Sequence, residues 1–175
     1  MISLYEMTIT NFIRTLDATV DVMKTGEVYF KENKINTDEI VTMRFAEDML
    51  PFSAQVNIAA HNAAGAIQSL FDGEFKPPQV SLDGLSYSEL IAYFEKTVET
   101  LKAFAENEVN ALYGKPLQFK VGGHELPFTT ENFMMSFAIP NVYFHTTTIY
   151  DMLRIKGVPL GKKDYLGEMA VSAPV

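Results

Sequence analysis

The chain has 175 residues, of which 47% are hydrophobic and 21% charged, with no cysteine and a formal net charge of −8. This composition is typical of a folded chain that can bury a sizeable core, and we expect one domain over residues 1–175. Without cysteine there are no disulfides, thiolate metal ligands or cysteine nucleophiles. The acidic balance argues against nucleic acid as a partner, because phosphate binding needs concentrated Lys and Arg.

The start of the chain, MISLYEMTITNF, lacks the basic stretch and the long apolar run of a signal peptide. No segment approaches the roughly 18 consecutive apolar residues of a membrane span. We therefore expect a cytoplasmic protein without a membrane partner.

The first half of the chain predicts two long helices. Residues 3–32 carry apolar side chains at the spacing of one helical face, and Ser3 can cap their start. A break with a short turn at 38–43 follows. Pro51 then suits the first turn of a helix over residues 51–71, where its missing N–H costs little.

A third helix is expected over residues 86–106. It begins with a capping box, in which Ser86 and Glu89 stand three residues apart. The preceding loop, DGEFKPPQVSLDG, is long enough to cross a helical bundle, so the helices need not alternate in direction.

Residues 115–129 change from a helical period to a period of two. Apolar residues alternate on either side of the pair Gly122 and Gly123, which predicts a β-hairpin with a two-residue turn. A lone hairpin is marginal in water, so we expect it to lie against the helices.

The last helix is predicted over residues 141–156. Pro140 should kink or interrupt the helical structure that begins near residue 130, and Gly157 is a natural residue to end the helix. The expected fold is all-α, a four-helix bundle with a small β-hairpin before the last helix.

His145 lies on the apolar stripe of this last helix. Ile149 shares its face, while Asn141 and Thr148 stand about one turn away on the same side. Gln55 lies near the edge of the stripe on the second helix. Buried polar groups without partners are costly, so these residues predict either a hydrogen-bonded core network or a pocket for a ligand or metal.

The other two histidines are placed less favourably for a shared site. His61 points roughly 160–180° away from the apolar stripe of its helix, at 100° per residue. His124 follows the turn of the hairpin and should be exposed. A three-histidine site would need both to turn inward. The chain also lacks the Glu-x-x-His motifs of di-iron bundles and the motifs of hydrolases and nucleotide-binding proteins.

Three segments, DMLPFSAQVNIAAHNAAGA, VGGHELPFT and FAIPNVYFHTTTIYDMLRIKGVPLGKKDYLG, together resemble a bacterial family of unknown function. That family belongs to the DinB/YfiT-like superfamily of four-helix bundles, which includes metal-dependent hydrolases and thiol transferases. The resemblance implies a metal site of three histidines, one on the second helix and an HxxxH pair on the last. His145 falls on the second position of this pair, Asn141 replaces the first, and either Gln55 or His61 falls near the third.

Two hypotheses follow for function, and whether the protein is an enzyme stays open. The favoured one is a metal-free bundle with a small-molecule pocket around Asn141 and His145, or a dimeric interaction role, with no cofactor. The alternative is a metal-dependent hydrolase or thiol transferase that holds Zn or Ni through His145 and His61. The resemblance and the many aromatic and methionine side chains also predict a homodimer.

Overall fold

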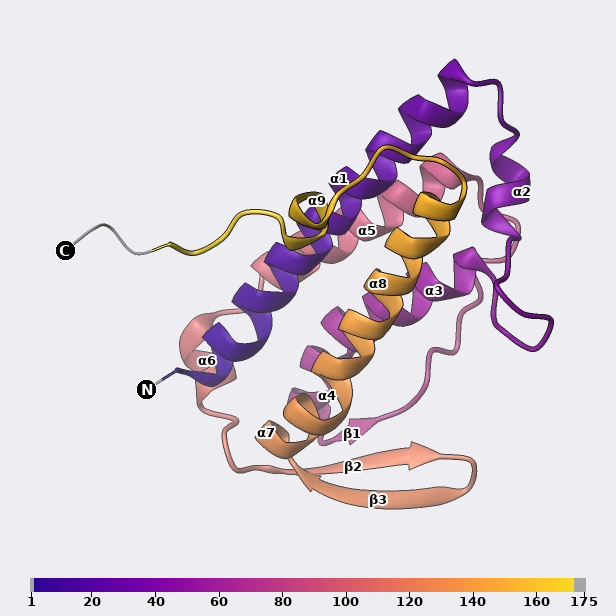
Figure 1. Ribbon diagram of the computed structural model, residues 1–175. Coiled ribbons are helices and arrows are strands. Elements are labelled where there is room, and N and C mark those ends of the chain that lie inside the picture. Colours follow the sequence, from indigo (N-terminus) through magenta and orange to yellow (C-terminus); the bar gives the residue numbers. More distant parts are fainter. Residues whose placement is uncertain (1, 172–175) are drawn as a thin grey trace.

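Helices account for most of the protein, as the computed structural model shows for residues 2–171 (Figure 1). The prediction of a mostly helical fold is confirmed, and a small three-stranded sheet accompanies the helices. In chain order the elements are α1 (Asn11–Glu32), α2 (Thr37–Val41), α3 (Phe52–Ala60), α4 (Ala66–Asp72), β1 (Glu74–Phe75), α5 (Tyr87–Lys102), α6 (Glu106–Asn110), β2 (Pro116–Val121), β3 (His124–Thr129), α7 (Thr130–Phe133), α8 (Ile139–Ile155) and α9 (Lys162–Leu166).

Three π-helical turns lengthen these helices. One, Glu6–Thr10, precedes α1; a second, His61–Gly65, joins α3 to α4; and a third, Met134–Ala138, joins α7 to α8. Helical structure therefore runs on through Pro140, so the proline does not interrupt it. Pro140 stands in the first turn of α8, directly after the π turn.

The ends of the helices follow their capping residues. The Ser3 hydroxyl accepts a hydrogen bond from the Glu6 N–H at 3.1 Å, and the Glu6 carboxylate accepts one from the Ser3 N–H at 2.9 Å. Ser86 and Glu89 form the predicted capping box at the start of α5. The third helix is shorter than predicted, because α5 ends at Lys102 and α6 is separate.

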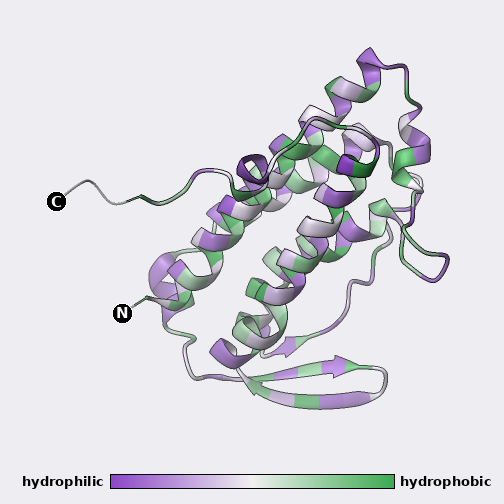
Figure 2. Cartoon of the chain, in the orientation of Figure 1, coloured by the Kyte–Doolittle hydropathy of each residue, from purple (hydrophilic) through white to green (hydrophobic). Residues whose placement is uncertain are grey.

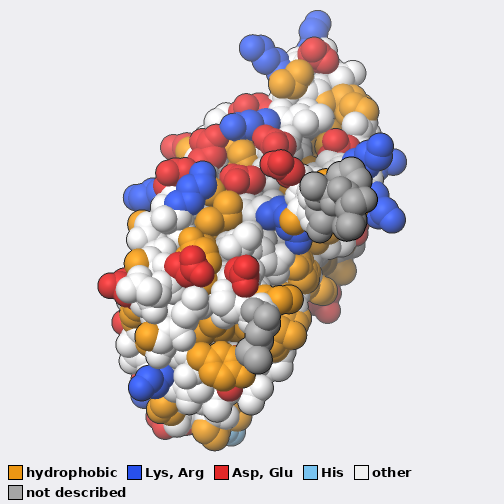
Figure 3. Space-filling model, turned by 90° about the vertical axis from the view of Figure 1, so that its left-hand side faces the viewer, with side chains coloured by type: hydrophobic (Ala, Val, Ile, Leu, Met, Phe, Trp, Pro, Cys, Tyr) orange, Lys and Arg blue, Asp and Glu red, His pale blue; other side chains and the backbone are white. Residues whose placement is uncertain are grey.

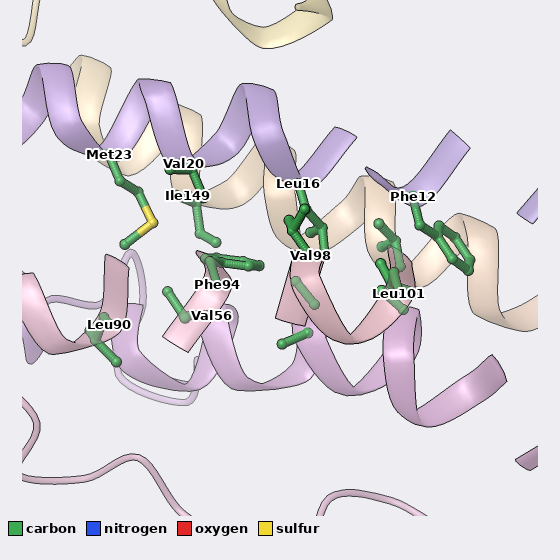
Figure 4. Packing of buried hydrophobic residues seen from close by; sticks show 14 of the residues in the cluster. Phe12, Leu16, Val20, Met23, Val56, Leu90, Phe94, Val98, Leu101 and Ile149 are labelled. Atoms are coloured by element: carbon green, nitrogen blue, oxygen red, sulfur yellow. The ribbon is translucent and has the colours of Figure 1, made fainter. Parts of the chain in front are cut away.

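Four long helical segments enclose the core of the described range. Helix α1 packs on α5 and α8, and α3 packs on the same two helices. Figure 4 shows side chains from all four meeting in the interior, and Leu16, Val56, Phe94 and Ile149 are fully buried. Figure 2 shows hydrophobic and hydrophilic residues alternating along these helices, as expected when one face of each is buried.

The long segment after β1 runs back along the molecule to the start of α5 (Figure 1). As a result α3 and α5 run in the same direction, and the helices do not alternate up and down.

The sheet lies at one end of the helices. Strands β2 and β3 are antiparallel around Gly122 and Gly123, which have positive φ angles of 56° and 80°. Strand β1 pairs parallel with β2 and is not predicted from its two-residue sequence. Rings of Phe119 and Phe137, 4.5 Å apart between centroids, attach the sheet to the last helix.

Among residues 2–171, no helix is both long enough and apolar enough to cross a membrane.

Candidate functional site

His145 occupies the side of α8 that packs against α3. Only 9% of its surface is exposed, and its neighbours on the same stripe, Val142 and Ile149, are fully buried. His124 lies on the surface beside the hairpin turn. Both placements agree with the sequence-based expectation for these histidines.

The structure pairs His145 with Gln55 of α3. The Gln55 Oε1 atom lies 2.7 Å from His145 Nδ1, and the Gln55 Nε2 atom donates a hydrogen bond to the Leu50 carbonyl at 2.9 Å. Because the amide nitrogen must face the carbonyl, the amide oxygen faces the imidazole. His145 therefore carries its proton on Nδ1 and donates it to Gln55.

The other ring nitrogen of His145 has a free lone pair. Burial lowers the pKa of His145 from 6.5 to about 4, so the imidazole is neutral near pH 7. Its Nε2 atom has no hydrogen-bond partner within residues 2–171. The only fully enclosed side-chain atom without a partner in this range is Asn62 Oδ1, so Nε2 still reaches solvent.

Apolar side chains neighbour the residues of this pair. The Phe144 ring stands edge-to-face against the His145 ring, with centroids 5.1 Å apart, and 61% of Phe144 is exposed. Leu50, whose carbonyl anchors Gln55, also has an exposed side chain. The pair of Gln55 and His145 thus lies at the edge of the core with apolar groups beside it.

Asn141 and Thr148 do not join this pair in the way their spacing predicts. The Asn141 amide donates to the Phe137 carbonyl at 2.8 Å, and the Thr148 hydroxyl donates to the Phe144 carbonyl at 2.8 Å. Both hydrogen bonds stay within the last helix and satisfy carbonyls four residues back. Of the four predicted residues, Gln55 and His145 are the two that hydrogen-bond to each other.

His61 serves a different part of the molecule. Its Nε2 atom lies 2.7 Å from the Lys76 carbonyl, and its ring centroid is 5.1 Å from that of Phe75. It follows Gln55 by six residues, an offset of about 240° around the helix at 100° per residue. His61 is therefore directed toward β1 and is not brought to His145.

Residues 4–166 match the family described as a domain of unknown function, DUF1993. The chain belongs to this family. A similar solved structure, the crystal structure of a DinB family member protein from Shewanella denitrificans, shares 29% sequence identity with a TM-score of 0.82. The alignment covers 98% of this chain and 96% of that one.

These similarities place the DUF1993 protein in the DinB-like superfamily, as its sequence predicts. No curated protein matches the chain.

The donor groups of the DUF1993 protein do not fit the three-histidine site that the resemblance implies. His145 Nε2 can supply one ligand, but His61 is bonded to a backbone carbonyl and Asn141 replaces the partner histidine. Within residues 2–171, no three His, Cys, Asp or Glu side chains are placed to share a metal ion. A catalytic zinc ion usually needs three protein ligands, so this arrangement is incomplete.

A further polar residue of the same helical segment as Gln55 is buried. Asn62 follows Gln55 by two helical turns, is 3% exposed, and donates to the Ile58 carbonyl at 2.9 Å. Its Oδ1 atom is enclosed without a partner. The spacing of seven residues from Gln55 places Asn62 on the same side of the helix. The unpaired oxygen depends on tertiary packing and has no signal in the sequence.

Proposed function

We propose that the DUF1993 protein binds a small organic molecule at the Gln55–His145 pair. In this proposal, His145 Nε2 accepts a hydrogen bond from an O–H, N–H or S–H group of the ligand. The observation that carries it is the 2.7 Å contact between His145 Nδ1 and Gln55 Oε1, which holds the ring in one tautomer and directs the lone pair to the other nitrogen.

The two ring nitrogens of His145 are used unequally, and this supports a binding role for Nε2. A core histidine is usually satisfied at both nitrogens, because an unpaired buried acceptor is costly. Here the protein satisfies Nδ1 and leaves Nε2 to solvent or a ligand. The flanking Phe144 ring would supply apolar contact to the rest of a bound molecule.

The protonation of His145 favours binding over acid–base catalysis. An efficient general base has a pKa near the working pH, whereas the pKa of His145 is lowered to about 4. At pH 7 the imidazole is a good hydrogen-bond acceptor but a weak base. We therefore infer a binding role, in keeping with the favoured hypothesis from the sequence.

The alternative is a metal-dependent hydrolase or thiol transferase that uses a degenerate histidine site. One feature supports it, because metal-bound imidazoles usually donate their other N–H to a protein oxygen, as His145 does to Gln55. Elemental analysis of protein purified without a metal-affinity tag separates the two proposals. Stoichiometric Zn or Ni would reject the metal-free site.

The binding proposal is tested by NMR titration with phenol and with benzyl alcohol. We expect the His145 Nε2 resonance to shift saturably while the Nδ1–H resonance keeps its position. His145→Ala should abolish the saturable response of nearby Phe144, and His124→Ala, at an exposed histidine, should leave it unchanged. Equal responses in the wild type and His145→Ala would contradict the proposal.

We further infer that the four long helical segments form the four-helix bundle of the superfamily and that the protein pairs as a homodimer. The packing of α1 and α3 on both α5 and α8 supports the bundle. Large apolar side chains left exposed on α8, including Phe144 and Ile155, support the dimer.

A further inference from the structure

A small cavity lies where α1, α8 and α9 meet. Helix α9 rests on α1 beside α8 (Figure 1). The cavity has a volume of about 240 Å³, and its lining combines one cation with hydroxyl and apolar groups: Arg14, Thr15, Tyr143, Tyr165 and Leu166. None of these residues belongs to the Gln55–His145 pair.

The Arg14 guanidinium has unused hydrogen-bonding capacity. Its Nη2 atom donates to Asn11 Oδ1 at 2.9 Å, and its Nη1 atom makes only a long contact of 3.5 Å with the Leu166 carbonyl. A guanidinium carries five N–H donors. Among the side chains that the structure describes, Arg14 forms no ion pair with a carboxylate, although it is half-buried.

The Tyr165 hydroxyl supplies a second spare donor. Thr147 donates its proton to the Tyr165 oxygen at 2.9 Å, and Thr146 donates its proton to the Val142 carbonyl at 2.8 Å. The Tyr165 proton is left with the Thr146 oxygen, 3.4 Å away, which is beyond the normal range for O–H···O hydrogen bonds. Tyr165 can therefore donate to a ligand.

Tyr143 shows the contrasting case in the same cavity. Its hydroxyl donates to Asn11 Oδ1 at 2.8 Å, so its proton already has a partner. The Tyr165 ring is held against Tyr150, with centroids 5.9 Å apart. The free hydrogen-bond donors of the cavity thus belong to Arg14 of α1 and Tyr165 of α9, and these two helices pack against each other.

The surrounding charge limits the ligand to a monoanion. Arg14 also borders a neighbouring cavity whose lining includes Asp17, Asp21 and Glu168. Burial raises the pKa of Asp17, and Lys102 of α5 acts in the opposite direction. Figure 3 shows acidic side chains gathered on the upper half of one face, with Lys and Arg side chains among them. One cation in this setting can offset one negative charge, but not the two of a phosphate dianion.

We propose that the cavity between Arg14 and Tyr165 binds a small monocarboxylate. Two N–H groups of the guanidinium fork would donate to the carboxylate oxygens, and the Tyr165 hydroxyl would give a third hydrogen bond. A volume of about 240 Å³ restricts the ligand to a few non-hydrogen atoms beyond the carboxylate. The site is separate from the proposed ligand site at His145 and does not depend on it.

The test is a titration of the full chain with sodium acetate and sodium propionate at constant ionic strength, followed by the NMR signal of the Arg14 side chain. We expect saturable binding of the wild type. Arg14→Gln should remove detectable binding, as followed by backbone amide signals near the cavity. Tyr165→Phe, which keeps the ring, should raise the Kd about tenfold, since a hydrogen bond to a charged group is lost.

The control is Lys163→Gln, which removes a positive charge from α9 at a position that does not line the cavity. It should change the Kd less than twofold. If Lys163→Gln weakens binding as much as Tyr165→Phe, the attraction is only general charge and the proposal fails. Tighter binding of phosphate than of acetate, or an unchanged Kd in Tyr165→Phe, would also overturn it. Tyr165→Phe decides the outcome if Arg14→Gln does not fold.

Discussion

The two ring nitrogens of His145 stand in different surroundings, and this difference is the chemical basis of the candidate site. Nδ1 donates to the Gln55 amide oxygen, and the Gln55 amide nitrogen in turn donates to the Leu50 carbonyl. Nε2 has no partner among residues 2–171 and still reaches solvent. Burial then keeps the ring neutral, so its lone pair persists across the physiological pH range.

The lowered pKa of His145 predicts a specific loss of stability in acid. The unfolded chain binds a proton at this histidine below about pH 6.5, whereas the folded protein does so only below about pH 4. Stability from His145 is therefore complete above pH 6.5 and is lost as the pH falls toward 4. We expect His145 to lower the free energy of unfolding by about 2 kcal/mol over this pH range. This is less than the full free-energy equivalent of the pKa shift, because part of the ring reaches solvent.

The measurement is urea unfolding of the wild type and His145→Gln at several pH values between 7 and 4. Other titrating groups are common to both proteins and cancel. The stability advantage of the wild type should shrink steadily over this range. Parallel pH profiles would show that His145 is not held neutral in the folded protein.

Asn141→His tests whether the site descends from a metal centre. The change restores two imidazoles four residues apart, on one face of α8. Asn141 bonds only within its own helix, so its loss removes no contact between helices. Zinc at about ten times its Kd should raise the Tm of Asn141→His by about 3–5 °C, because the ion binds the native state.

Two comparisons decide how that result is read. Adding His145→Ala to the variant should remove the zinc response. The wild type should show no zinc-dependent rise in Tm. If it does show one, and if His145→Ala abolishes that rise, the metal-free proposal is wrong. If neither the wild type nor Asn141→His responds to zinc, the two positions were not arranged for metal, and the two side chains serve their separate hydrogen bonds instead.

At the scale of the elements, periodicity and capping predict the helices well, and the π turns mark where prediction fails. The capping box at Ser86 and the turn at Gly122 and Gly123 are local signals, and the structure contains both features. A π turn has no such local signature, so the continuous helix through Pro140 is not predictable from the proline alone. Strand β1 has two residues and depends on its neighbour β2.

At Gly26 of α1, we expect side-chain packing to outweigh helix propensity. Alanine is favoured over glycine in a helix by about 1 kcal/mol. A Cβ atom at Gly26, however, would lie 2.7 Å from the Tyr87 hydroxyl, which donates to the Met23 carbonyl at 3.0 Å in the core. We expect Gly26→Ala to lower the free energy of unfolding by about 1–3 kcal/mol, measured by urea unfolding.

A double-mutant cycle identifies the cause. Tyr87→Phe removes the hydroxyl that blocks the alanine, at the cost of one buried hydrogen bond worth about 1 kcal/mol. In that background Gly26→Ala should be neutral or stabilising. If the alanine is equally harmful with and without the Tyr87 hydroxyl, the crowding comes from another neighbour, such as Leu153.

At the scale of the whole molecule, the arrangement of the helices decides which predicted residues meet. The seven-residue and four-residue spacings on α8 place His145 inward, and this is visible in the sequence. That Gln55 reaches Nδ1 depends on the packing of α3 against α8, and that Tyr165 lines the same cavity as Arg14 depends on the path of the chain after α8. Contacts between segments this far apart are not encoded in any local pattern, so only part of the site is predictable.

The outer side of α8 leads to the last prediction, that the protein is a homodimer. Phe144 and Ile155 stand eleven residues apart, an offset of about 20° around the helix, so they lie in one stripe that also holds the exposed Asp151 and the buried Thr148. Their exposed fractions are 61% and 71%. Pairing two copies through this stripe would remove apolar surface from water at about 25 cal/mol per Å², and closed twofold pairing is the commonest form of assembly.

Sedimentation equilibrium at micromolar concentration should give twice the mass of the 19.6 kDa chain. Phe144→Glu would place a charge in the proposed interface and should shift the protein toward the monomer. Val80→Glu introduces the same charge at a side chain that is 68% exposed and lies outside α8, so it should leave the dimer intact. A wild type that sediments only as the 19.6 kDa species would reject the dimer. If the two substitutions affect assembly equally, the interface does not lie on α8.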